Sequence, residues 1–441
     1  MIGACCLLPN LGAEEGHDWE GLRRYPAVRV AARLWSHLFS ADSSVCRPSV
    51  SVSASAATSV SSPLRLERQR CGDLWPAALG APAPEPTYAW LEPAEGAVPW
   101  LATRTLAETA EGALGLSLVG PDPDRVTRVH DKAFALAEAR SGGLLSPGLE
   151  GLPIALEPGE LEDPEAVLCR IEAWVRGWPE WTGGRFTLKP RLGSSGRGRV
   201  AGMGVGGPAR DAIRSALPRL ARRGGAILEP WLDRRCDLSA CVYLPPPEAG
   251  ETPPTLLGSL EQILSPGGGF RGHCGELDAR GRVYSGHRED EAVRTSSVWL
   301  AERARSRGFF GPCGVDAFSY VEGDRERLRP ALELNARATM GLVSLGLVRR
   351  ALPLVRERLG LAGEARRGFL MTLLSGSASA SADGVRRGAD AQADEIATRA
   401  GGGVIRLSLA AEDDHAGPRP TLFFGPDRAT LRDAHRVVTG C

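Results

Sequence analysis

The stretch 184-GRFTLKPRLGSSGRGRV-200 is the part of the sequence from which the fold can best be predicted. It carries Lys189, one of only two lysines in 441 residues; the other is Lys132. Lysine and arginine together number 53, so 53 − 2 = 51 are arginines. Lysine is a compact charge on a flexible stem, whereas arginine is a bulky planar fork. Two lysines that persist in so arginine-rich a chain are candidates for places that need a compact ammonium group, and chance is the alternative.

The residues around Lys189 predict a strand that runs into a phosphate-binding loop. The strand is 185–190, and a flexible run follows it. Backbone N–H groups of such a run can form a nest that binds oxyanions. No G-K-[ST] follows the glycines, so this is not a Walker A loop, and 199-RVAGMGVGG-207 is too glycine-rich to open a Rossmann helix. A simple hairpin turn is the alternative. The loop residues concerned are Gly193, Ser194, Ser195, Gly196 and Gly198.

A second pattern, 314-GVDAFSY-320 with 331-ALELNARATMG-341, predicts a β-hairpin that carries metal ligands. Asp316 should lie across the ladder from Glu333 and Asn335, and alternation along the strand places Glu333, Asn335 and Arg337 on one face. Carboxylate and amide oxygens suit Mg²⁺, which shares its ligands with phosphates. Arg337 would meet anionic oxygens. A solvated strand face is the alternative, but the apolar flanking residues argue against it.

A third pattern, 224-GGAILEPWLDRRCDLSACVYL-244, predicts a buried strand that breaks and then resumes. The break exposes backbone groups that can read the edge of a base, in the segment Pro230, Trp231 and Leu232. Glu229 could accept a hydrogen bond from an exocyclic amine, and Asp237 could bind ribose hydroxyls. An ordinary β-turn with surface acids is the alternative, and it is favoured when this stretch is taken alone.

Composition excludes several classes of protein. The 53 acidic residues balance the 53 basic ones, which argues against a nucleic-acid or anionic-membrane partner. No apolar run approaches the ~18 residues of a membrane span, and the amino terminus lacks the basic region of a signal peptide. We therefore expect a cytoplasmic protein. Its ten cysteines include no C-x-x-C pair, and reduced structural thiols are expected rather than disulfides or a zinc site.

Periodicity predicts alternating helices and strands over most of the chain. Three domains are expected: 1–115, which contains a Ser-rich loop at 48–62; 116–365; and a carboxy-terminal α/β appendage at 366–441. A loop is predicted at 375–384. Helices are expected at 27–39, 124–140 (one helix or two short ones), 163–178, 209–223, 289–308, 341–360 and 427–438. Strands are expected at 116–120, 185–190, 199–207, 226–232, 237–244, 254–265, 280–287, in the 314–338 hairpin, at 403–409 and at 420–426.

In their order, these motifs resemble the ATP-grasp superfamily over about residues 116–360. The segment 118-LVGPDPDRVTRVHDK-132 resembles the entry into that fold, where Lys132 would take the place of a phosphate-binding lysine. Lys189 would be the second such lysine, and Glu229 to Asp237 the adenine hinge and ribose acid. Asp316, Glu333 and Asn335 resemble the metal motif. The resemblance implies an α+β fold in which two α+β lobes sandwich ATP, behind an amino-terminal pre-ATP-grasp α/β domain.

The resemblance further implies a carboxylate–amine ligase that uses ATP and Mg²⁺, with Mn²⁺ as an alternative metal. A carboxylate would form an acyl phosphate, and an amine or thiol would displace phosphate, with ADP released. Arg337 and Lys189 would be catalytic. The partners expected are small molecules, and a homodimer is compatible with the family. One alternative is a phosphotransferase on the same scaffold that moves phosphate to a hydroxyl or to a histidine, for which His130 and His273 are candidates. The other alternative is a non-catalytic ATP-binding protein. Arg271, Arg294 and the 266-PGGGFRGH-273 loop are candidate carboxylate contacts.

Overall fold

The computed structural model divides the chain into two compact units. The first comprises Met1–Asp124, Glu276–Arg282 and Arg337–Gly440, and the second comprises Arg125–Gly275 and Val283–Ala336 with Cys441. The three-domain division expected from the sequence stays a prediction. The residues that the structure describes are 6–11, 13, 25–48, 66–91, 96–193, 198–204, 206–265, 268–375, 382–401, 403–409 and 418–441.

The amino-terminal part of the first unit is a small α/β layer. Its sheet has the order β3-β2-β1-β4, in which β1 runs parallel to β2 and β4 while β3 is antiparallel to β2. Leu106 and Ala110 of α3 pack on Leu8 and Ala97 of the sheet. The elements are β1 (Cys6–Leu8), α2 (Pro26–Ser36), β2 (Ser44–Pro48), β3 (Leu66–Arg70), β4 (Ala97–Pro99) and α3 (Arg104–Leu114). The predicted Ser-rich loop lies outside the described residues from position 49 onward.

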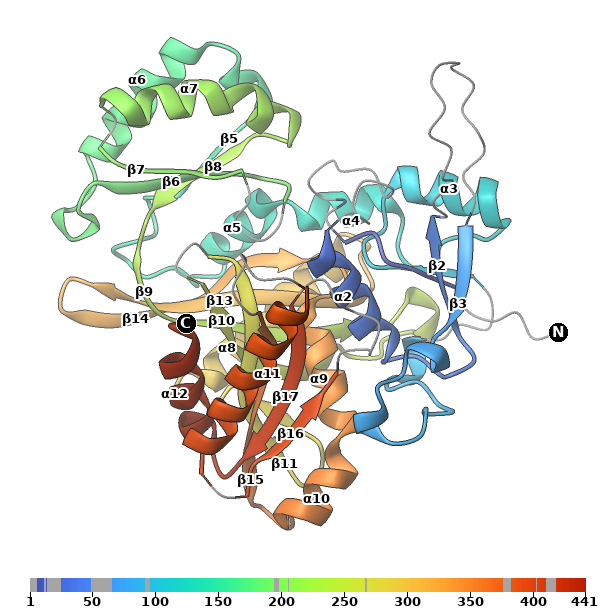
Figure 1. The fold of residues 1–441 in the computed structure, drawn as a ribbon. Coiled ribbons are helices and arrows are strands. Elements are labelled where there is room, and N and C mark those ends of the chain that lie inside the picture. The colour runs from blue at the N-terminus through green and yellow to red at the C-terminus, as the bar shows by residue number, and fades with distance from the viewer. Residues whose placement is uncertain are drawn as a thin grey trace. The chain divides into compact units, whose positions relative to one another are not determined.

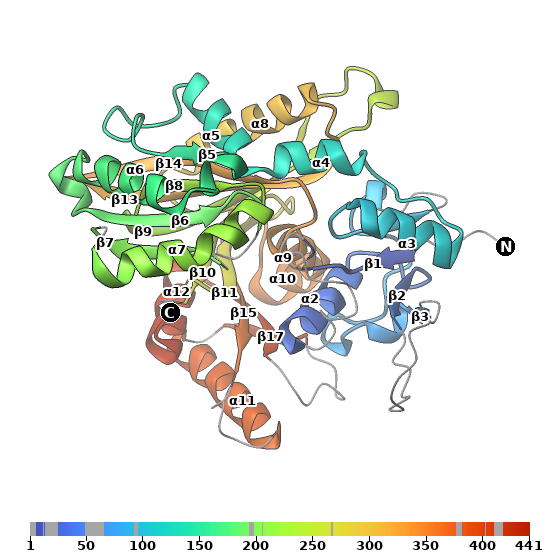
Figure 2. The same ribbon diagram turned by 90° about the horizontal axis from the view of Figure 1, so that it is seen from above.

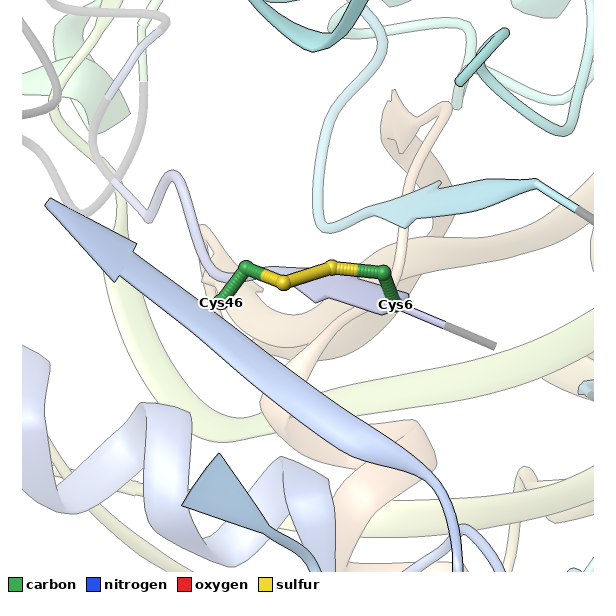
Figure 3. Close-up of a disulfide and its surroundings, with 2 residues drawn as sticks. All are labelled: Cys6 and Cys46. Atoms are coloured by element: carbon green, nitrogen blue, oxygen red, sulfur yellow. A yellow bond between two sulfur atoms is a disulfide. The ribbon is translucent and has the colours of Figure 1, made fainter. Parts of the chain in front are cut away.

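A disulfide joins Cys6 to Cys46 in this sheet, across the neighbouring strands β1 and β2 (Figure 3). The expectation of reduced thiols throughout the chain is therefore wrong for this pair. Forty positions separate the two cysteines along the chain, and only the pairing of β1 with β2 brings their Cα atoms to 6.1 Å. Cysteine spacing in the sequence gives no sign of such a long-range pairing.

The carboxy-terminal part of the first unit is a three-stranded antiparallel layer with the order β15-β17-β16. Figure 1 shows α11 and α12 beside these strands. Asp427 caps α12 by accepting a hydrogen bond from the backbone N–H of Thr430, at 2.8 Å. The elements are α9 (Met340–Arg350), α10 (Leu352–Leu359), β15 (Arg366–Leu374), α11 (Ala382–Arg399), β16 (Ile405–Ser408), β17 (Arg419–Gly425) and α12 (Arg428–Thr439).

The second unit contains two antiparallel sheets, and the smaller has the order β5-β8-β6-β7. Helices α6 and α7 lie on one side of it (Figure 1), and apolar residues of both helices share a core with Phe186 and Leu188 of β6. The elements are β5 (Ile154–Leu156), α6 (Pro164–Arg176), β6 (Arg185–Pro190), β7 (Val200–Met203), α7 (Gly207–Arg222) and β8 (Ala226–Pro230).

The larger sheet of the second unit has the order β14-β13-β9-β10-β11. Val293 of α8 packs on Leu238 and Ala240 of β9 and on Ala317 of β13, so α8 covers one face. Figure 2 shows α8 beside α5. The elements are α4 (Pro123–His130), α5 (Lys132–Ser141), β9 (Asp233–Leu244), β10 (Thr255–Leu264), β11 (Phe270–Asp278), β12 (Val283–Tyr284), α8 (Asp290–Ser306), β13 (Gly311–Glu322) and β14 (Arg325–Asn335).

Three predicted elements differ from the observed ones. The strand expected at 116–120 is absent, and only an isolated bridge joins Leu118 to Ala97. The single helix expected at 341–360 is two helices, because Pro353 has no N–H with which to continue the hydrogen bonds of α9. Residues 382–384, which were expected in a loop, begin helix α11. None of the helices in the described ranges has the length and apolar character needed to cross a bilayer.

Candidate active site

Strand alternation places Lys189 on the face of the small sheet that is turned away from α6 and α7. Phe186 and Leu188 point into the helix-covered core, so Thr187 and Lys189 point the other way. The same alternation in β8 buries Leu228 under the helices and sends Glu229 to the face of Lys189. The Lys189 Nζ atom lies 2.7 Å from Glu229 Oε1, and the lysine side chain is 14% exposed.

Arg329 of β14 holds the other oxygen of Glu229, with its NH1 atom 2.8 Å from Glu229 Oε2. Both side chains are buried, at 3% exposure each. Burial alone would raise the pKa of Glu229, but Lys189 and Arg329 outweigh burial and hold it below its ordinary range. Burial lowers the pKa of Lys189 in spite of the attraction of Glu229. This triad of two cations and one carboxylate joins the small sheet to the large one within the second unit.

The Glu229 contacts bear on its expected role in base recognition. Each carboxylate oxygen already receives a cation, so a hydrogen bond from an exocyclic amine would require one of these ion pairs to open. The sequence analysis missed Arg329. An irregularity in the β13–β14 ladder separates it from Glu333, and nothing local marks it among the 51 arginines.

Lys132 is the first residue of helix α5, where a cation is electrostatically unfavourable because the helix N-terminus is positive. The Lys132 side chain is nevertheless buried and contacts two partners. Its Nζ atom donates to the backbone oxygen of Gly193 at 2.5 Å and lies 3.3 Å from Glu333 Oε2. Asp131 caps the helix by accepting a hydrogen bond from Ala133 N, at 2.8 Å. The geometry brings Lys132 to the end of the strand that carries Lys189.

The β13–β14 hairpin brings together the three predicted metal ligands. Asp316 pairs directly with Glu333, and Asn335 donates from Nδ2 to Asp316 Oδ2 at 3.0 Å. Gln262 of β10 donates from Nε2 to the other oxygen of Asp316, at 2.6 Å. Ser239 of β9, which lies opposite Asp316 in the ladder, also hydrogen-bonds to it. The sequence analysis missed Gln262 and Ser239, which come close only through pairing between strands.

The two carboxylates hold their protons very differently. Burial and the adjacent Glu333 raise the pKa of Asp316 to about 7. Burial would also raise the pKa of Glu333, but Lys132 and Lys189 lower it to about 2. The two side chains share a hydrogen bond, so Asp316 keeps a proton that Glu333 accepts.

This donor set fits Mg²⁺, because a divalent cation would replace the shared proton and find hard oxygen ligands. Asp316, Glu333 and the amide oxygen of Asn335 are the residues that would hold it. Over the described ranges, no cluster of three or more His, Cys, Asp or Glu side chains is arranged to hold a metal. The predicted set contains two carboxylates and an amide, so the remaining ligands would come from phosphate and water.

Arg337 does not share the strand face of Glu333 and Asn335. Strand β14 ends at Asn335, because the next amide, of Ala336, donates to His130 Nδ1 at 3.2 Å instead of to the ladder. Arg337 belongs to the first unit, where its NH1 atom donates to the backbone oxygen of Ala338 at 2.9 Å. The expected placement on that face is wrong, and its catalytic role stays a prediction.

The expected nucleotide hinge lies at the junction of β8 and β9. Pro230 ends β8 and β9 begins at Asp233, which leaves Trp231 and Leu232 between the strands. Trp231 donates its backbone N–H to Arg185 O at 2.9 Å. The guanidinium of Arg199 lies 4.4 Å from the centre of its indole ring. Asp237 is paired with Arg234, at 2.7 Å. Whether these residues contact a nucleotide stays a prediction.

The expected phosphate loop is described only at its two ends. Gly193 and Gly198 have φ angles of 146° and 79°, which glycine adopts readily. A Cβ atom at Gly193 would lie 1.7 Å from Arg223 NH2, so a larger residue there would require the Arg223 side chain to move. Ser194, Ser195 and Gly196 lie outside the described residues.

The remaining candidates divide between the two faces of the large sheet. Arg294 of α8 donates to Ser259 Oγ at 3.4 Å and to Val283 O at 3.3 Å. Ser259 and Gln262 are three residues apart on β10, so their side chains lie on opposite faces of the sheet. Arg294 therefore lies on the α8 face, away from Asp316. His273 pairs with Gln262 on the site face but is 3% exposed, and His130 is 5% exposed. Arg271 is exposed on β11.

Two antiparallel sheets with helices on their outer faces thus hold both lysines and the paired carboxylates between them. An ATP-grasp fold, in which two α+β lobes sandwich ATP, stays a prediction. The α+β class expected from the sequence is confirmed.

No protein-family model matches the sequence, and no curated protein matches it. Among solved structures, the chain is similar to carboxyaminoimidazole ribonucleotide synthase from Aspergillus clavatus complexed with ATP, at 18% identity, a TM-score of 0.45 and coverage of 78% of this chain and 80% of that one. It is similar to a biotin carboxylase–ATP complex from Campylobacter jejuni, at 13% identity, a TM-score of 0.45 and coverages of 78% and 74%. It is also similar to D-alanyl-alanine synthetase A from Vibrio cholerae, at 14% identity, a TM-score of 0.43 and coverages of 76% and 89%. The residue roles proposed for this chain rest on its own contacts.

Proposed function

We propose that this chain is an ATP-dependent ligase that joins a carboxylate to an amine or thiol through an acyl phosphate. The observation that carries the proposal is the position of Glu333, whose pKa is lowered by both Lys132 and Lys189. Two buried ammonium groups next to a pair of carboxylates form a site of alternating charge. Such a site can hold a polyphosphate on its cations and a divalent metal on its acids at the same time.

Each residue has a distinct task in the proposed reaction. Lys132 and Lys189 would leave Gly193 and Glu229 in part and take up phosphate oxygens of ATP. Asp316, Glu333 and Asn335 would hold Mg²⁺, which supplies charge neutralisation to the phosphates. Because the lysines and acids are largely buried, their fields act with little screening by water on the transferring phosphoryl group.

The substrate carboxylate would then attack the γ-phosphorus, forming a carboxyl–phosphate bond as the bond to the ADP oxygen breaks. The nitrogen or sulfur nucleophile would attack the acyl carbon and release phosphate. Water must be kept from the acyl phosphate, since hydrolysis would waste it. The Gly193–Gly198 segment would serve that purpose. Recognition of the base would fall mainly to backbone groups of residues 230–232, because Glu229 is engaged with cations.

The test is nucleotide turnover by the purified full chain with mixtures of carboxylates and amines. We expect Mg²⁺-dependent ADP formation that requires both a carboxylate and a nucleophile, and its loss in Lys189→Ala. Arg210→Lys is the matched control, because Arg210 lies on α7 in an ion pair with Glu165. AMP and pyrophosphate as products would exclude this reaction, and full activity in Lys189→Ala would favour the non-catalytic alternative.

A further inference from the structure

Arg191 follows strand β6 directly, two positions after Lys189. Its side chain makes a two-pronged contact with Asp131: Nε lies 3.0 Å from Oδ1 and NH2 lies 2.6 Å from Oδ2. Its third nitrogen, NH1, lies 2.6 Å from Glu157 Oε1. The Arg191 and Asp131 side chains are only 13% and 17% exposed. We call Arg191, Asp131 and Glu157 the Arg191 clamp.

The clamp also holds Lys132, the other lysine of the chain. Asp131 is the N-cap of α5, so the carboxylate that Arg191 grips also fixes the start of the helix at Lys132. The backbone adds a second tie, since Lys132 N donates to Arg191 O at 3.2 Å. The lysine side chain adds a third, from Nζ to Gly193 O. The backbone N–H and the side-chain Nζ of Lys132 are therefore both bonded to residues 191–193, which follow Lys189.

Arg191 is also fixed to the small sheet. Its backbone N–H donates to Gly225 O at 3.1 Å, immediately before β8, the strand of Glu229. The clamp thus connects α5 to the strands that carry Lys189 and its carboxylate. Two lysines that come from separate elements, 57 positions apart in the sequence, are held in a fixed relation through one guanidinium.

We propose that Arg191 is a positioning residue that sets the spacing of Lys132 and Lys189 for the phosphates of a nucleotide. The inference rests on the proposed function, because it assumes that these lysines bind phosphates. Arginine is required here, since its planar fork satisfies two oxygens of Asp131 while a third nitrogen reaches Glu157. Lysine has a single nitrogen and cannot make these contacts together.

The experiment compares the binding of ATP and of adenosine by calorimetry for the wild type, Arg191→Lys and Asp131→Asn. Asparagine keeps an oxygen that can cap α5 and removes the charge that Arg191 grips. We expect ATP affinity to fall about tenfold in both variants, with adenosine affinity unchanged because adenosine has no phosphate. The double variant should lose little more than either single one, since both remove the same contact.

Arg214→Lys is the control, because two nitrogens of Arg214 contact Oε1 of Glu165, Nε at 3.2 Å and NH2 at 2.6 Å, on the outer helices. It should leave both affinities unchanged. Equal losses of ATP and adenosine affinity in Arg191→Lys would show a merely structural role and overturn the inference, as would unchanged ATP affinity. If the wild type binds neither ligand, the proposed function itself fails, which is a separate result.

Discussion

Asp316 faces Glu333 directly across the β13–β14 ladder, and the two carboxyl groups share a hydrogen bond. Their surroundings push their proton affinities apart. Burial and Glu333 raise the pKa of Asp316, whereas Lys132 and Lys189 lower that of Glu333 against the effect of burial. The pair therefore carries one proton below neutral pH, and in the proposed function it would bind a divalent cation when that proton leaves.

The first prediction concerns Mg²⁺ and pH. The folded pKa of Asp316, about 7, lies above its unfolded value near 4. Its contribution to stability is thus present below about pH 4 and is lost as the pH rises through 7. In the proposed function Mg²⁺ binds the ionised pair, so we expect the increase in Tm on adding Mg²⁺ to be larger at pH 8 than at pH 6. Thermal unfolding measures this. Asp316→Asn should abolish the increase, and an equal Mg²⁺ effect at both pH values would contradict the assignment.

The second prediction concerns the buried triad. Glu229→Gln leaves Lys189 and Arg329 without a counter-charge at a site where both are buried. The free energy of unfolding should fall by about 3 kcal/mol, as measured by urea denaturation. Glu165→Gln is the control, because Glu165 forms ion pairs with Arg210 and Arg214 on an exposed surface, where little change is expected. Equal stability of the two variants would show that Glu229 is not a structural counter-ion.

The third prediction asks why lysine persists at two positions. In Lys132→Arg and Lys189→Arg the charge remains, but a longer planar group must fit where the lysine side chains are only 10% and 14% exposed. We expect kcat/KM for ATP to fall at least tenfold, or about 1.4 kcal/mol in transition-state stabilisation. Arg176→Lys, on the exposed surface of α6, should have no effect. Retention of full activity by both lysine variants would leave chance as the explanation for the two lysines.

The fourth prediction separates the ligase from a phosphotransferase that uses histidine. Burial lowers the pKa of His273 to about 3, and His130 accepts a hydrogen bond from Ala336 N. Neither ring is exposed enough to meet a γ-phosphate without rearrangement. Incubation with γ-³²P-ATP should therefore leave no acid-labile, base-stable label on the protein. Label that disappears in His130→Asn or His273→Asn would support the phosphotransferase instead.

Local patterns predicted the parts of the site that depend on alternation. The pairing of Asp316 with Glu333 follows from the two-residue period of strands. Helical structure around Lys132 was expected within 124–140 from the apolar periodicity of that segment. Each of these features depends on neighbours in the sequence.

Features that depend on distant pairing could not be predicted. Gln262 and Ser239 reach Asp316 only because β10, β9 and β13 lie in register. The Cys6–Cys46 disulfide depends on a parallel strand pair. Arg191 and Arg329 are two among 51 arginines, and nothing local distinguishes them from solvated ones. The prediction placed Arg337 on strand β14. The hydrogen bond between Ala336 and His130 ends this strand at Asn335, two residues before Arg337.

The most direct test of the ligase reaction follows oxygen atoms. The full chain is incubated with ATP, Mg²⁺, an amine and an ¹⁸O-labelled carboxylate that supports turnover, and the products are analysed by mass spectrometry. Attack of the carboxylate on the γ-phosphorus predicts ADP and inorganic phosphate that carries one oxygen from the carboxylate, with both products lost in Lys189→Ala. Unlabelled phosphate, or AMP with pyrophosphate, would contradict it.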